Sequence, residues 1–99
     1  MKALASILPG LMRDLGLEER ATGWRAVVEW PALAGERIAR RTRATDFRDG
    51  VLTVEVEGSA WMHELGFLKR ELVRKVNQHL GGSIVRDVRF ILARGGIQR

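Results

Sequence analysis

Apolar residues in the first forty positions recur every three or four residues, which is the spacing of amphipathic helices. This pattern predicts a first helix over residues 3–15 that Gly16 ends. A second helix is expected over residues 18–30, because its two leading glutamates suit the positive end of a helix dipole. Pro31 favours a break there, and the pattern then predicts a third short helix over residues 33–40.

From residue 42 the pattern changes to an alternation of apolar and polar positions, which predicts β-strands. Two alternating runs, residues 42–47 and 52–56, flank the dipeptide Asp49-Gly50. Asp-Gly favours a type I′ hairpin turn, in which both central residues have a positive φ. This turn would also set the register of the two strands. The expected core-facing pairs are Phe47–Leu52, Thr45–Val54 and Arg43–Val56.

The longest periodic stretch predicts a helix that starts at an N-cap, Ser59, and ends at Gly81-Gly82. An alternating segment over residues 85–92 predicts a third strand, with Val88, Phe90 and Leu92 directed inward. The order of elements is helices followed by β-β-α-β, which indicates an α+β fold whose small sheet is covered by helices on one face.

The chain has 99 residues and is long enough for one domain with one modest core. We expect a single domain over residues 1–92, made of an N-terminal helical part (1–29) and a core (30–92), and a flexible tail over residues 93–99. No apolar run reaches the ~18 residues that span a bilayer, and Pro9-Gly10 interrupts the apolar start as a signal peptide would not. These features predict a cytoplasmic protein.

The composition excludes several kinds of chemistry. There are no cysteines, so disulfides, thiol nucleophiles and iron–sulfur clusters are excluded. The sequence contains no Walker loop and no Gly-x-Ser-x-Gly elbow. His63-Glu64 begins a zinc-protease motif, but the position of the second histidine is occupied by Phe67. We therefore expect a non-enzyme without a metal or cofactor.

Basic residues outnumber acidic residues by 17 to 12, which gives a net charge of +5 and favours an anionic partner. They form three clusters, over residues 37–48, 69–75 and 86–99. On the long helix, Phe67 lies in one stripe with Arg70 and Arg74, and single-stranded nucleic acid uses such a combination for stacking and phosphate contacts. The alternative is a solvated basic face, with Phe67 at the edge of the core. The predicted nucleic-acid contacts are Arg37, Arg40, Arg41, Arg43, Phe67, Lys69, Arg70, Arg74 and Lys75.

Three tryptophans are many for a small domain. Trp24, Trp30 and Trp61 each lie on an apolar helical face, which favours a place in the core. Trp30 directly precedes Pro31, and a helix break there would expose it. Trp30 is therefore also the candidate contact for a protein partner.

Four segments resemble, in order along residues 30–92, the motifs of one protein family. They are residues 30–35 with Ala39 and Thr42, the hairpin 47–54, the helix start 59–61 with Glu64, Leu65, Leu72 and Asn77, and the closing strand 85–90. In this order they resemble the DciA-like proteins, bacterial operators of the replicative helicase. The segment around Trp61 after the Asp49-Gly50 hairpin is the most specific combination.

The resemblance implies a KH-like fold, contact with a DnaB-type replicative helicase and affinity for single-stranded or branched DNA. It also implies a role in helicase loading during DNA replication. A KH domain normally clamps nucleic acid with a Gly-x-x-Gly loop, which this sequence lacks, so any nucleic-acid contact must use another surface. Two alternatives remain at this point, a protein-interaction adaptor without nucleic-acid binding and a KH-like RNA-binding protein.

Overall fold

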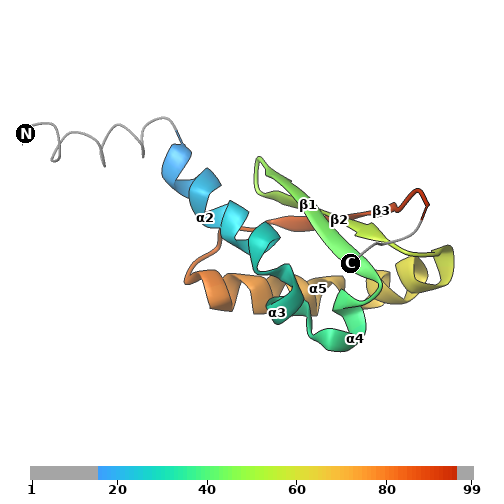
Figure 1. The fold of residues 1–99 in the computed structure, drawn as a ribbon. Coiled ribbons are helices and arrows are strands. Elements are labelled where there is room, and N and C mark those ends of the chain that lie inside the picture. The colour runs from blue at the N-terminus through green and yellow to red at the C-terminus, as the bar shows by residue number, and fades with distance from the viewer. Residues whose placement is uncertain (1–15, 96–99) are drawn as a thin grey trace, which may run out of the picture.

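The computed structural model describes residues 16–95, so the predicted first helix and the last four residues lie outside the described part (Figure 1). The order of elements confirms the α+β prediction. The elements are α2 (Leu17–Val28), α3 (Trp30–Ala34), α4 (Glu36–Ala39), β1 (Thr42–Arg48), β2 (Val51–Val56), α5 (Ser59–Leu80) and β3 (Asp87–Leu92).

The three strands form one mixed sheet in the order β1-β2-β3. β1 and β2 are antiparallel, whereas β3 is parallel to β2 and is reached through α5. The helices lie on one face of this sheet, with α2 against β1 and α5 against β3 (Figure 1). The other face of the sheet is left to solvent. Side chains that alternate along each strand therefore divide into a buried row and an open row.

The predicted hairpin turn is confirmed, since Asp49 and Gly50 have φ values of 52° and 79°. The Phe47–Leu52 pair is also confirmed. The other two expected pairs are wrong, because a β-bulge between Ala44 and Asp46 shifts the register by one residue. The observed partners are Ala44–Val54, Arg43–Glu55 and Thr42–Val56. The bulge thus directs Thr42 and Ala44 into the core, and Arg43 is exposed.

The short helices differ from prediction at their boundaries. α2 ends before Glu29, and Trp30 opens α3 with Pro31 in its first turn, where the missing N–H has no intrahelical acceptor. Gly35, with φ 87°, divides the predicted third helix into α3 and α4. The predicted cap Ser59 is instead the first residue of α5, which ends as predicted at Gly81 with φ 83°.

Trp30 is a core residue, and the prediction that a helix break exposes it is wrong. Its side chain is 1% exposed, and its Nε1 donates to Thr42 Oγ1 at 2.9 Å. The Thr42 hydroxyl in turn donates to the Ile38 carbonyl at 2.7 Å. A buried indole N–H with a partner ties the start of β1 to α3 and α4. Trp30 therefore has no surface to offer a protein partner.

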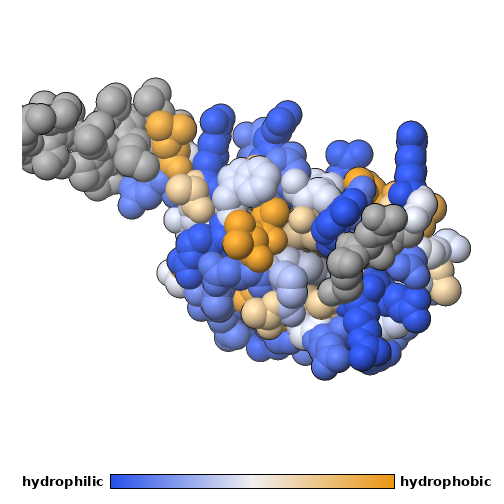
Figure 2. Space-filling model, viewed as in Figure 1, coloured by the Kyte–Doolittle hydropathy of each residue, from blue (hydrophilic) through white to orange (hydrophobic). Residues whose placement is uncertain are grey.

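Two other predicted core residues lie at the surface. Trp24 is 43% exposed, and Leu92, expected to point inward, is 52% exposed. Trp61 is half-buried and packs against the core. Helix α2 accordingly has two apolar faces, and Figure 2 shows hydrophobic surface over its outer one. The large exposed side chains on that outer face are Leu17, Trp24 and Val28.

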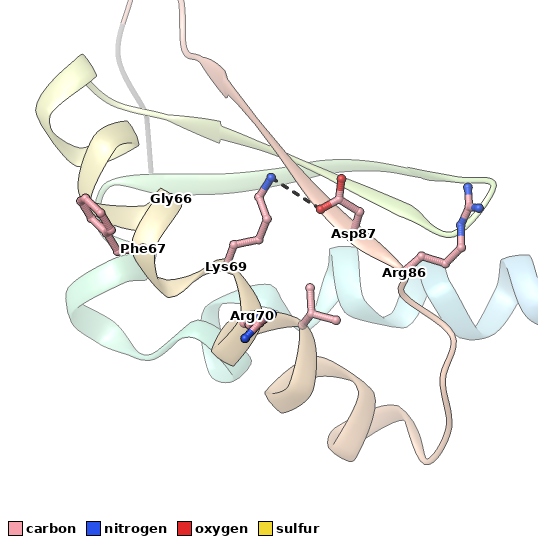
Figure 3. Close-up of a pocket in the computed structure, with 7 residues that line it drawn as sticks. Gly66, Phe67, Lys69, Arg70, Arg86 and Asp87 are labelled. Carbon is pink, nitrogen blue, oxygen red and sulfur yellow. Dashed lines mark ion pairs between the residues drawn. The ribbon is translucent and has the colours of Figure 1, made fainter.

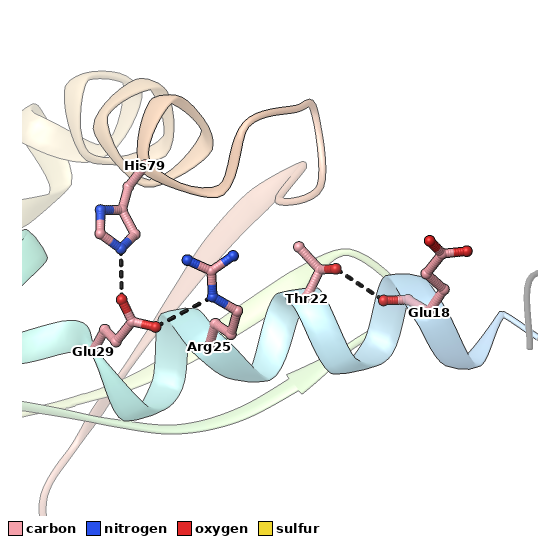
Figure 4. A network of polar contacts seen from close by, with 5 residues as sticks. All are labelled: Glu18, Thr22, Arg25, Glu29 and His79. Atoms are coloured by element: carbon pink, nitrogen blue, oxygen red, sulfur yellow. Dashed lines mark hydrogen bonds and ion pairs between the residues drawn. The ribbon is translucent and has the colours of Figure 1, made fainter. Parts of the chain in front are cut away.

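The inner face of α2 packs closely on β1. A Cβ atom at Gly23 would lie 2.2 Å from the Phe47 ring, so only glycine allows this approach. The end of α2 is tied to the end of α5 through Glu29, whose carboxylate accepts from His79 Nε2 at 2.6 Å and from Arg25 Nε at 3.3 Å (Figure 4). The hydrogen bond from His79, followed by that from Arg25, lowers the pKa of Glu29 below its ordinary value of 4.5.

Asn77 fixes the connection between α5 and β3. Its Oδ1 accepts from the Ile84 and Val85 N–H groups at 3.1 and 2.8 Å, and its Nδ2 donates to the Val85 carbonyl at 2.8 Å. The Asn77 carbonyl also accepts from Gly81 at the helix end. One side chain thus satisfies the backbone groups of this loop and sets where β3 begins.

Candidate nucleic-acid interface

A groove of about 520 Å³ lies between α5 and the start of β3 (Figure 3). It is lined by Gly66, Phe67, Lys69, Arg70, Val73, Arg86 and Asp87. Three predicted nucleic-acid contacts, Phe67, Lys69 and Arg70, therefore come together here. The groove adds Arg86 from the loop before β3, which is not among the predicted contacts.

The periodicity of α5 explains why its residues line the groove. Leu65, Leu72 and Val76 are buried in the core, so the residues that follow them around the helix lie on the flank beside β3. Phe67 lies beyond this flank and is 76% exposed. Its ring is met edge-on by His63, with the centroids 5.1 Å apart. Phe67 is thus a solvent-facing aromatic ring rather than an edge of the core.

Arg86 is positioned by the hairpin turn. Its backbone N–H donates to the Gly50 carbonyl at 2.7 Å, and its Nη2 donates to the Asp49 carbonyl at 2.7 Å. The aliphatic part of the side chain lies on Gly50, where a Cβ would come within 2.9 Å of Arg86 Cγ. A residue that follows the long helix is therefore held beside residues from the middle of the chain.

Lys69 reaches from α5 across the edge of β3. Its Nζ lies 3.5 Å from Asp87 Oδ1 and 5.9 Å from the centroid of the Phe90 ring (Figure 3). Both groups are exposed, so the ion pair contributes little to stability and can be exchanged for another anion. Asp87 also accepts the Val88 N–H at 2.9 Å.

A second hollow, of about 690 Å³, continues the groove onto the open face of the sheet. It shares Lys69, Arg86 and Asp87 with the groove and adds two arginines, Arg48 and Arg89, and two carboxylates, Asp46 and Asp49. Among residues 16–95, no carboxylate forms an ion pair with Arg48, Arg70, Arg86 or Arg89. We call the combined region the α5–β3 surface; it consists of Arg48, Phe67, Lys69, Arg70, Arg86 and Arg89.

Within residues 16–95, the predicted contacts among residues 37–43 are arginines that form ion pairs with acidic residues, unlike the arginines of the α5–β3 surface. Each of its four guanidinium groups pairs with a glutamate. The pairs are Arg37–Glu64 at 3.1 Å, Arg40–Glu36 at 3.0 Å, Arg41–Glu57 at 2.9 Å and Arg43–Glu55 with Nε–Oε1 at 3.0 Å. Arg37 also lies over the Trp61 ring, at 5.4 Å from its centroid. We call these four residues the arginine cluster.

The two basic regions meet α5 from different sides. Glu64, which binds Arg37, and Lys69, which reaches β3, are five residues apart on α5 and therefore lie about 140° apart around the helix. Arg37 and Lys69 thus lie on opposite flanks of α5, whereas Arg43 shares the open face of the sheet with the second hollow. Arg74 and Lys75 are exposed but line neither hollow, and Arg74 lies 3.9 Å from Glu71.

Other kinds of site are not found in the described part of the chain. Within residues 16–95, no three acidic or histidine side chains are grouped so that they could hold a metal ion. In the same range, no helix is both long and apolar enough to cross a membrane.

Comparison with known proteins gives a family match over most of the chain. Residues 3–90 match the family model described as "Dna[CI] antecedent, DciA". A "UPF0232 protein" of Mycolicibacterium paratuberculosis is 34% identical over 81% of this chain and 46% of its own length. Similar proteins of Mycobacterium tuberculosis (30% identical) and Rhodococcus jostii (32% identical) are each matched over 81% of this chain and 43% of their own length. The chain thus spans less than half the length of these relatives.

Proposed function

The chain belongs to the DciA family, and from this premise we propose that it is a non-enzymatic accessory of a DnaB-type helicase in DNA replication. We further propose that its α5–β3 surface binds single-stranded or branched DNA, in the cytoplasm, where replication takes place.

The observation that carries the DNA-binding proposal is an exposed aromatic ring beside arginines that have no carboxylate partner among the described residues, 16–95. Phe67 offers a face on which a base can stack, and Arg70 and Arg86 line the same groove. Stacking platforms beside cationic grooves are typical of proteins that bind single strands with little sequence preference. Arginine forks also match phosphate geometry. The groove replaces the missing Gly-x-x-Gly loop as the expected contact surface.

A different face is proposed for the helicase. The outer face of α2 exposes Leu17, Trp24 and Val28, and apolar residues grouped on one helix face are typical of protein interaction sites. This face takes the role that the sequence suggested for Trp30. Because the α2 face and the groove belong to different elements, one chain could hold DNA and a helicase together.

The test is a titration of fluorescein-labelled oligo-dT of about 20 nucleotides, long enough for several nucleotide sites. If Lys69, Arg70, Arg86 and Arg89 each contact a phosphate, affinity should fall about 50-fold between 50 and 200 mM salt, since the slope is about −0.7 for each contact. Purified DnaB-type helicase is titrated in parallel against the chain and against Trp24→Ser, Val28→Ser. Salt-independent DNA binding would refute the phosphate contacts, and unchanged helicase binding by the variant would refute the α2 face.

A further inference from the structure

The outer edge of β3 presents unpaired backbone groups. Asp87 N–H donates to the Gly50 carbonyl at 3.4 Å and Ala93 N–H donates to the Val56 carbonyl at 2.9 Å. These two bonds fix the alternation, because successive N–H groups along a strand point to opposite sides. The odd-numbered residues of β3 therefore bond to β2. The N–H groups of Val88, Phe90 and Leu92 point away from the sheet.

At one end of this edge the outward N–H group has an acceptor, and at the other, the open end, the outward N–H groups have none within residues 16–95. The Val88 N–H is taken by Asp87 Oδ1, which Lys69 also approaches (Figure 3). For the N–H groups of Phe90 and Leu92, no acceptor is found among residues 16–95. The opposite edge of the sheet carries the bulge in β1, a common way to prevent strand addition. The β3 register is continuous from Asp87 to Leu92, and this strand has no such bulge.

The surroundings of the edge indicate what it can bind. Five cations line the groove and the hollow beside it, against three carboxylates, so the surroundings carry a net positive charge; the cations are Arg48, Lys69, Arg70, Arg86 and Arg89, and the carboxylates are Asp46, Asp49 and Asp87. A second copy of this strand would bring a second net positive charge to the same edge, whereas an acidic segment would complement the charge. Acidic side chains are favoured instead, because one of them could replace Asp87 at Lys69.

Apolar side chains are needed as well. Leu92 is half-exposed at the open end, and Phe67 and Val73 line the groove on the α5 side. Alternate residues of an added strand would point toward α5 and toward the open face. An occupant with apolar residues on one side and acidic residues on the other fits both.

We propose that the β3 edge binds an extended acidic segment of a partner protein as a fourth strand. Its backbone bonds to the N–H groups of Phe90 and Leu92, its apolar side chains face α5, and a carboxylate pairs with Lys69. This is the β-augmentation mode of peptide recognition. The inference goes beyond the proposed function, since it requires neither DNA nor the α2 face.

The first test measures amide exchange in the ¹⁵N-labelled full chain by NMR. The probe is a blocked peptide of alternating glutamate and valine, about seven residues long to match a typical strand. Exchange at Phe90 and Leu92 should slow by about tenfold or more with peptide. Arg89 and Ile91, which already face β2, should change little. Peptide binding that leaves Phe90 and Leu92 unprotected would overturn the proposal.

The second test removes one donor from the edge. Leu92→Pro deletes an N–H that points outward, and proline is tolerated at such edge positions. Leu92→Ala is the matched control, because it shortens the same side chain and keeps the N–H. Peptide affinity should fall by about tenfold in Leu92→Pro and change by about threefold or less in Leu92→Ala, since one backbone hydrogen bond is the difference.

A third test uses the unaltered chain, so that its result does not depend on whether the proline variant folds. The same peptide with N-methylated valines lacks half of its backbone donors and should not bind the unaltered chain. Binding of this methylated peptide with unchanged affinity would overturn the proposal. Protection of Phe90 and Leu92 by oligo-dT and not by peptide would assign the edge to nucleic acid. Protection without peptide that rises with protein concentration would assign it to a second copy.

Discussion

Two groups of arginines, the arginine cluster and the arginines of the α5–β3 surface, look alike in the sequence and differ in the structure. In the arginine cluster, every guanidinium group is paired with a glutamate. On the α5–β3 surface, Arg70, Arg86 and Arg89 have no carboxylate partner within residues 16–95. Net charge along a segment therefore does not measure the charge that is available to a ligand. Availability depends on what the fold places opposite each side chain.

The pairing in the arginine cluster follows from strand geometry. Arg43 and Glu55 are direct cross-strand partners on the open face of the sheet. Glu57 continues β2 beyond its last residue, and its N–H donates to the Arg41 carbonyl at 2.8 Å, which brings their side chains together. The two hollows of the α5–β3 surface are also lined by carboxylates, Asp46, Asp49 and Asp87, but the ion pair found there within residues 16–95 is Lys69–Asp87, so its arginines are not neutralised in this way.

The largest effect on DNA affinity is expected from removing two arginines of the α5–β3 surface, compared with removing two arginines of the arginine cluster. Arg70→Ala with Arg86→Ala should lower affinity for single-stranded DNA by about 10- to 100-fold and make the salt slope shallower by about 1.4, since two phosphate contacts are lost. Arg37→Ala with Arg40→Ala is the matched pair, because it also removes two exposed arginines. Its affinity should change by about threefold or less. If the two double variants lose the same affinity in oligo-dT titrations, the arginine cluster contacts DNA as much as the α5–β3 surface does, and the distinction between the two groups is wrong.

A smaller effect is expected from the aromatic ring. Phe67→Ala should lower affinity for single-stranded DNA by about tenfold, because stacking of one base contributes about 1–3 kcal/mol. Phe67→Trp should retain affinity, since it keeps a stacking face. Thermal unfolding should be unchanged in both variants, because the side chain is largely exposed. Full affinity of Phe67→Ala would show that the surface binds phosphates alone.

A third prediction concerns the glutamates that pair with the arginine cluster. Glu55→Gln with Glu57→Gln releases Arg43 and Arg41 and leaves the volume of each side chain nearly the same. Affinity for single-stranded DNA should rise about threefold, with a salt slope steeper by about 0.7 or more, as new phosphate contacts form. Glu18→Gln with Glu19→Gln on α2 controls for the change in net charge. If both double variants bind DNA equally well, pairing with glutamate is not what prevents the arginine cluster from binding DNA.

The sequence predicted those parts of the fold that depend on local signals. Asp49-Gly50 and Gly81 were sufficient for the turn and the helix end, because both require a positive φ at those positions. The bulge after Ala44 has no comparable local signal, so the register was wrong for half of the hairpin. The segments that resemble the family include Trp30 and Thr42, which form a buried hydrogen bond, so that part of the resemblance reports the core rather than the site.

The candidate site was predicted in part for the same reason. Phe67 and Arg70 are three residues apart on one helix, and helical spacing places them on one stripe, while Lys69 reaches the same groove from the side of α5 that faces β3. Arg86 joins them only because the fold places the loop before β3 on the hairpin turn, 37 residues from Asp49. Likewise, Glu64 lies 27 residues from the arginine that it binds. Contacts over such separations carry no signal in spacing or composition.

The smallest effect is expected at an ion pair outside both regions, between Glu29 and His79. Hydrogen bonds from His79 and Arg25 lower the pKa of Glu29, so the carboxylate stabilises the fold above its ordinary pKa of 4.5. This stabilisation is lost as the pH falls through the lowered pKa. Glu29→Gln should therefore reduce Tm slightly near pH 6, by a few degrees at most, and the difference should shrink as the pH is lowered below 4.5. DNA affinity of this variant at neutral pH should match that of the unaltered chain, because Glu29 lines neither hollow. A Tm difference that persists at low pH would show that Glu29 acts through packing of α2 on α5 and not through its charge.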